Sequence, residues 1–174
     1  LRGDAGRWAA IRMKLTQLQQ AEDRALAGGR QIDKELSPLV TEAIGELLKI
    51  AADNETAASR TAAIGVVEPL VNRYADLERF DLAEAVVALV AGSEKTALAD
   101  WAAWMRIGLL DRQAARSLAL ATTQLDPRSQ PSLNEFHQRE LEQIAQLIAK
   151  HPQSEYLAQA VERVVQIAGV YQSH

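Results

Sequence analysis

The chain has 174 residues, a size that usually forms one domain with a core of its own. Apolar residues make up 48% of it but aromatic residues only 5%, and alanine is abundant, which favours closely packed helices over a sheet core. The formal net charge of −4 provides no dense positive field, so we predict that nucleic acid is not a partner. The absence of cysteine excludes disulfides and thiolate chemistry.

Apolar residues recur at spacings of three and four along most of the chain, and no segment alternates as a strand does, so we predict an all-α fold. A first helix should end near Ala27, because two glycines follow it. A second helix should begin at Ser37-Pro38, a cap followed by a first-turn proline. We expect these two helices to form an N-terminal antiparallel hairpin over residues 1–53.

The residue pattern in the middle of the chain predicts further helices. A third helix should begin near Asn54 or Thr56 and reach Tyr74, and we expect Pro69 to break or kink it. After a polar turn, Asp81 can cap the next helix through its side-chain oxygen.

Four more helices complete the prediction. Ser93 should cap a helix that carries Trp101, and Asp111 should start another that Pro127 ends. The last two helices flank a His-Pro turn and should form a C-terminal hairpin over residues 131–174.

The segment from Leu70 to Val90 resembles the tetratricopeptide repeat, a helix-turn-helix whose pattern runs L-G-x2-Y, then A-x3-F, then P. The matching positions are Leu70, Tyr74 and Ala83, whereas Val71 and Val87 replace the Gly and the Phe. A partial second match extends from Trp104 to Pro127, so the resemblance covers roughly residues 63–127.

This resemblance implies antiparallel helical hairpins stacked as a right-handed superhelix, and a compact helical bundle is the alternative. The repeat-like hairpins would occupy residues 54–130. Together with the terminal hairpins they should form one continuous domain.

The resemblance also implies that a partner binds to the first helices of successive hairpins, where Glu68, Asn72 and Asp76 share one helix face at spacings of four. Asn72 takes the position at which some members of the family bind the terminal carboxylate of a peptide. Glu68 stands where that ligand would need a cation, and two carboxylates repel each other, so this mode of binding is disfavoured.

A second candidate contact lies in the following helix. Arg106 has Trp101 and Trp104 nearby in the sequence, and together they can offer a cationic and aromatic surface to a partner. The alternative is that both tryptophans belong to the core and that Arg106 is an ordinary surface charge.

Sequence signals for catalysis are missing. The histidines are His137, His151 and His174, at no spacing that suits a helix-borne zinc site, and we expect all three at the surface. Neither a nucleophile-elbow motif nor a phosphate-binding glycine loop occurs. We therefore predict that the protein is not an enzyme and uses neither a metal nor another cofactor.

We predict a non-catalytic scaffold that binds a protein or peptide or assembles as a homo-oligomer. The alternative is a helical sensor or ligand-binding bundle, such as the soluble part of a membrane-anchored protein, with a pocket near Trp101, Trp104 and Tyr74. No apolar run is long enough to span a bilayer. The Ala and Arg bias suggests a bacterial protein, and its compartment, cytoplasm or periplasm, stays open. Leu1 at the start leaves room for a preceding signal peptide or anchor.

Overall fold

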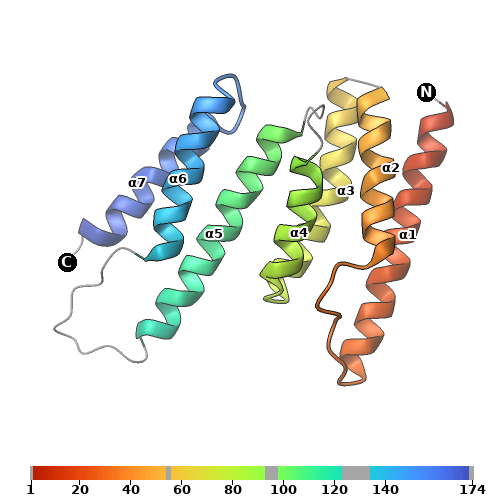
Figure 1. The fold of residues 1–174 in the computed structure, drawn as a ribbon, viewed down its shortest axis with the longest axis horizontal. Helices are drawn as coiled ribbons and strands as arrows, with labels where there is room; N and C mark the ends of the chain where they lie inside the picture. Colours follow the sequence, from red (N-terminus) through yellow and green to blue (C-terminus); the bar gives the residue numbers. More distant parts are fainter. Residues whose placement is uncertain (1, 54–55, 93–97, 123–133, 173–174) are drawn as a thin grey trace. The chain divides into compact units, whose positions relative to one another are not determined.

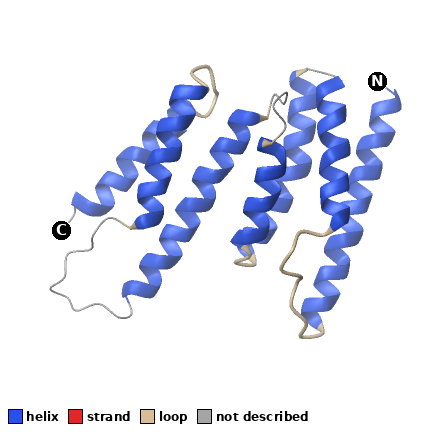
Figure 2. Ribbon diagram, viewed as in Figure 1, coloured by secondary structure: helices blue, strands red, loops and turns tan. Residues whose placement is uncertain are grey.

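The computed structural model describes residues 2–53, 56–92, 98–122 and 134–172. Over these ranges the chain is helical, with loops between the helices and no strand, so the all-α prediction is confirmed there (Figure 2). None of the helices in the described ranges combines the length and the apolar character that crossing a membrane requires. The predicted cap Ser93 and the predicted helix end Pro127 lie outside the described residues.

The chain divides into two compact units, residues 1–99 and residues 100–174. The described helices of unit 1 are α1 (Arg2–Ala27), α2 (Pro38–Asp53), α3 (Ala57–Asp76) and α4 (Phe80–Ala91). Those of unit 2 are α5 (Ala99–Thr122), which starts at the boundary, α6 (Glu135–Lys150) and α7 (Leu157–Gln172). The boundary between the units falls within the segment 54–130 that the sequence assigned to repeat-like hairpins.

In unit 1 consecutive helices run antiparallel, and α2 lies beside α1, α3 and α4 (Figure 1). Each helix turns an apolar face toward the others. Because these faces meet, the unit has its own core, whose largest fully buried side chains include Ile11, Ile44, Leu47, Ile50, Leu70, Tyr74 and Leu82.

The end of α1 follows the sequence prediction. Gly29 adopts a φ of 72°, a left-handed conformation that glycine reaches without strain. Its amide donates to the carbonyl of Leu26, and the amide of Arg30 donates to the carbonyl of Ala25, both at 2.9 Å. These two bonds form a Schellman cap, which turns the chain sharply away from the helix axis.

The start of α2 also follows the prediction. Pro38 is its first residue, and the Ser37 hydroxyl accepts a hydrogen bond from the amide of Leu39 at 3.3 Å. The irregular segment 30–37 between these two capped ends is therefore fixed at both sides by local interactions.

The predicted helix start at Asp111 and the predicted break at Pro69 are wrong, whereas a kink at Pro69 stays a prediction. α3 continues through Pro69: the proline leaves the Gly65 carbonyl without its amide donor, but both residues are exposed and water can satisfy that oxygen. α5 continues through Asp111, whose side chain pairs with Arg163 and does not cap a new helix. From Trp104 to Thr122, where this described range ends, the second stretch similar to the repeat consensus is thus one helix and contains no turn.

The turn between α3 and α4 is a second Schellman cap, formed without glycine. Glu78 adopts a φ of 58°, its amide donates to the Ala75 carbonyl at 3.0 Å, and the Arg79 amide donates to the Tyr74 carbonyl at 2.8 Å. Asp81 lies in the first turn of α4 and binds the guanidinium of Arg79. The prediction that Asp81 caps α4 is therefore wrong, because its carboxylate is engaged with this cation.

In unit 2, α6 and α7 lie side by side and run antiparallel, and side chains of α5 complete the core (Figure 1). Trp104 of α5 stacks on Tyr156 with ring centroids 5.7 Å apart and an interplanar angle of 7°. This stacked pair borders a cluster of buried apolar side chains from all three helices, namely Ile107, Ile144, Leu147 and Ala160.

Candidate functional site

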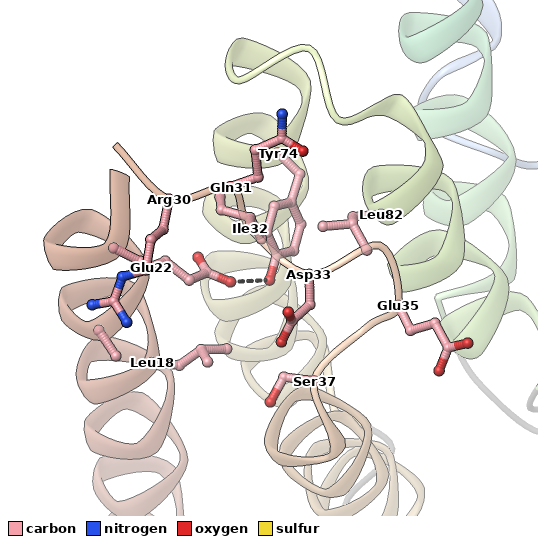
Figure 3. Close-up of a pocket in the computed structure, with 12 residues that line it drawn as sticks. Leu18, Glu22, Arg30, Gln31, Ile32, Asp33, Glu35, Ser37, Tyr74 and Leu82 are labelled. Carbon is pink, nitrogen blue, oxygen red and sulfur yellow. Dashed lines mark hydrogen bonds between the residues drawn. The ribbon is translucent and has the colours of Figure 1, made fainter. Parts of the chain in front are cut away.

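The candidate site is a pocket of about 330 Å³ in unit 1 (Figure 3). Three parts of the chain form it: the second half of α1, the segment 30–37, and the hairpin of α3 and α4. Several residues of the segment 30–37 are exposed, so the pocket opens to solvent. Apolar and charged side chains both line it, among them Leu18, Glu22, Ile32, Asp33, Tyr74 and Leu82.

One side chain fixes the wall that the segment 30–37 forms. Arg79 donates from Nη1 to the Ile32 carbonyl at 2.9 Å and from Nη2 to the Asp33 carbonyl at 2.8 Å. Asp81 holds the same guanidinium through Nε at 3.0 Å and Nη2 at 2.8 Å, and this hydrogen bonding lowers the pKa of Asp81. Arg79 thus ties an irregular loop to the α3–α4 turn, although some 47 residues separate them in the sequence.

A hydrogen-bonded carboxylate lies in the opposite wall. The Tyr74 hydroxyl donates to Glu22 Oε1 at 3.0 Å, and Arg73 Nη2 donates to Glu22 Oε2 at 3.3 Å. Burial, and then the charge of Glu22, raise the pKa of Tyr74, so its phenol remains a donor at neutral pH. The Glu22 side chain is only 10% exposed and is therefore held in one position.

Arg73 joins this network from the side. Its Nη2 also pairs with Asp23 at 2.9 Å, while its Nε atom is buried without a hydrogen-bond partner among the described residues. Because one guanidinium serves two carboxylates, the negative charge of Glu22 is partly neutralised.

The predicted partner-binding residues do not line this pocket. Glu68, Asn72 and Asp76 lie on α3 at the predicted spacing, the first two half-buried and the third exposed, and all three interact with other groups. Arg106 is half-buried on α5, in unit 2. Trp101 is only 1% exposed, which fits the alternative that it belongs to the core.

The alternative prediction, a ligand-binding bundle, placed a pocket near Trp101, Trp104 and Tyr74. Tyr74 lines the pocket of unit 1, but Trp101 and Trp104 do not. Trp104 is engaged with Tyr156 in unit 2. Of the three aromatic residues, only Tyr74 lines this pocket.

Unit 2 contains a buried polar cluster that the sequence analysis missed. His137 is 3% exposed and Glu140 is fully buried, so the prediction of a surface position for His137 is wrong. Their ligand atoms and one of Asp111 lie within 4.8 Å of one another. Arg163 already binds both carboxylates, with Nε 2.6 Å from Glu140 Oε1 and Nη2 on Asp111. Since this guanidinium supplies the positive charge, the cluster fits a buried ion pair better than a metal site.

The histidine of the cluster is held neutral. Burial, and then the charge of Arg163, lower the pKa of His137, whereas burial raises the pKa of Glu140 against the opposing effect of Arg163. The Tyr171 hydroxyl accepts from the Asn134 amide at 3.0 Å and lies 2.7 Å from His137 Nδ1. That hydroxyl can donate its own proton to Nδ1, which suits a neutral imidazole.

A signal for these residues is present in the sequence. His137, Glu140, Ile144 and Leu147 follow one another at spacings of three, four and three, which places them on one helix face. Polar residues at seam positions therefore mark the cluster.

The last helix leaves much apolar surface exposed. Only Ala160 and Ile167 of α7 are buried. The exposed large apolar side chains of the α6–α7 hairpin are Val161, Val164, Val165 and Val170 of α7 and Ile148 of α6. Several exposed apolar side chains on one hairpin are typical of interaction surfaces.

A comparison of the chain with models of known families, with curated proteins and with solved structures gave no match.

Proposed function

We propose that the protein is a non-catalytic scaffold of repeat-like helical hairpins that binds another polypeptide, with the pocket of unit 1 as the binding site. The pocket itself is the observation that carries the proposal. Its volume of about 330 Å³ is at the lower end for small-molecule sites, which are mostly apolar. A small, open pocket with mixed polar and apolar walls suits one side chain of a polypeptide.

The architecture supports a scaffold of the tetratricopeptide type. α1 to α4 are antiparallel helices, each beside the next, as in stacked hairpins. In such a scaffold the face of α3 that carries Glu68, Asn72 and Asp76 is a further surface for the partner. Arg106 is a candidate contact of unit 2.

Lack of catalysis is also part of the proposal. The hydroxyl groups that line the pocket are engaged, since Ser37 accepts the Leu39 amide and Tyr74 donates to Glu22. No histidine lines the pocket, so a hydroxyl there has no imidazole base beside it.

The test is selection of binders from a random peptide library on the immobilised full chain, followed by binding measurements with two variants. Ala21→Phe fills the pocket from an exposed lining position, whereas Gln20→Phe adds the same ring at an exposed α1 position outside the lining. We expect Ala21→Phe to abolish binding and Gln20→Phe to retain it. Failure to select any binder, or equal binding by both variants, would refute the proposal.

A second candidate function, self-association, is favoured by the exposed valines of α7. Val165 is 68% exposed, so Val165→Glu should leave the fold intact and remove apolar contact area. Sedimentation equilibrium of the wild type and this variant tests the idea. A concentration-dependent oligomer that the substitution disrupts supports it, and a monomeric wild type contradicts it.

A further inference from the structure

We infer that the pocket of unit 1 binds a basic side chain, an arginine or a lysine of the partner polypeptide. The inference rests on the proposed function and adds the chemistry of the ligand. It follows from the position of the apolar and the acidic groups around the pocket.

The apolar part of the pocket suits the stem of a long side chain. Leu18 contributes from α1, Ile32 from the segment 30–37 and Leu82 from α4. Arginine and lysine bury a hydrocarbon stem against apolar surface and keep the charged head near water or an anion. A pocket that opens to solvent can bury the stem and leave the charged head near water or a carboxylate.

Acidic groups predominate among the charged residues of the lining. Glu22, Asp33 and Glu35 carry carboxylates, and Arg30 carries the opposing cation. Glu22 is served by Arg73 and Tyr74. Within the described ranges, however, neither the Asp33 nor the Glu35 side chain has a cationic partner. A basic ligand would supply it.

Arg30 is the group that an anionic ligand would need. In Figure 3 its guanidinium lies on the α1 side of the pocket, whereas Asp33 and Glu35 lie on the other side of Glu22. An anion drawn to Arg30 would also face the three carboxylates, and like charges at that range disfavour binding. The arrangement therefore selects a cation over an anion.

Arg79 prepares the site for this ligand. By holding the carbonyls of Ile32 and Asp33 it fixes the backbone that carries Asp33 and Glu35. Fixing the loop in advance reduces the entropy that binding must overcome. Arg79 is thus a positioning residue, because its own donors are directed to the loop and to Asp81 and not to the pocket.

The experiment is an NMR titration of the full chain with three probes: N-acetyl-arginine amide, N-acetyl-norleucine amide and N-acetyl-glutamate amide. The arginine probe should shift the amide signals of pocket residues such as Ile32 and Asp33. Because partly exposed ion pairs contribute little more than about 1 kcal/mol, we expect it to bind about fivefold more tightly than the norleucine probe. Added salt should reduce that preference.

The variant Asp33→Asn/Glu35→Gln tests the cause. It should bind the arginine and norleucine probes equally, while Glu135→Gln/Glu142→Gln, with the same change in net charge at exposed sites of unit 2, should keep the wild-type preference. Equal binding of both probes to the wild type, tighter binding of the glutamate probe, or no shift with any probe would overturn the inference. None of these results decides the proposed function, because the selection of binders from the peptide library tests that function independently.

Discussion

Replacing Arg79 with methionine should loosen the wall of the pocket and destabilise unit 1. The substitution keeps an unbranched stem of similar length but removes the donors to the carbonyls of Ile32 and Asp33. Hydrogen bonds from a charged donor contribute about 1.5–3 kcal/mol each. The Asp33 bond is exposed and counts for less, so we expect a total loss of about 2–3 kcal/mol in the free energy of unfolding.

The matched control is Asp81→Asn, which weakens the ion pair to Arg79 and leaves the two carbonyl bonds in place. The Asp81 side chain is 55% exposed, and pairs of this kind contribute at most about 1 kcal/mol. Urea denaturation gives the free energies, and amide hydrogen exchange over residues 30–37 reports the loop. If Arg79→Met lowers the free energy of unfolding no more than Asp81→Asn, or if exchange in the loop is unchanged, the two carbonyl bonds do not hold the loop.

Three further predictions concern stability. Arg163→Met leaves the buried Glu140 carboxylate without its cation. In chemical denaturation it should destabilise the protein by about 3 kcal/mol at neutral pH, and by less in acid, where Glu140 is protonated. A loss below about 1 kcal/mol, the value of an exposed ion pair, would contradict this. The lowered pKa of His137 implies a contribution to stability that is present above the ordinary value of 6.5 and is lost as the pH falls through the lower folded value. When the free energy of unfolding is measured against pH, His137→Gln should lose this contribution and His151→Gln should retain it. Identical profiles for the wild type and His137→Gln would count against the prediction. Glu78→Gly should raise the thermal midpoint, with a gain of about 0.5–1 kcal/mol, because glycine adopts the φ of 58° without strain; a loss of stability would contradict the capping argument.

Local features of the fold could be predicted from the sequence. The end of α1 at a glycine pair and the start of α2 at Ser37-Pro38 depend on neighbouring residues only, and both agree with the structure. The predicted break at Pro69 and the predicted helix start at Asp111 were wrong, because a proline in an exposed turn does not have to end a helix and an aspartate paired across helices does not have to begin one.

The site depends on contacts that no local pattern shows. Glu22 and Tyr74 are 52 residues apart, and the pocket that both line exists only after α1 and α3 have come together. Arg79 reaches back to Ile32 across a similar separation. His137 was placed at the surface because the spacing of the histidines suits no metal site, and its contact with Tyr171, 34 residues away, is not visible in the sequence.

The most direct test of the central claim is a double-mutant cycle between the pocket and a peptide selected by the chain. Isothermal titration would compare the peptide with a form whose basic residue is replaced by norleucine, on the wild type and on Asp33→Asn/Glu35→Gln. We expect the norleucine replacement to weaken binding to the wild type about fivefold and to have little effect on the variant, a coupling of about 1 kcal/mol. Effects that add independently, within about 0.3 kcal/mol, would contradict the claim that this pocket recognises a basic side chain.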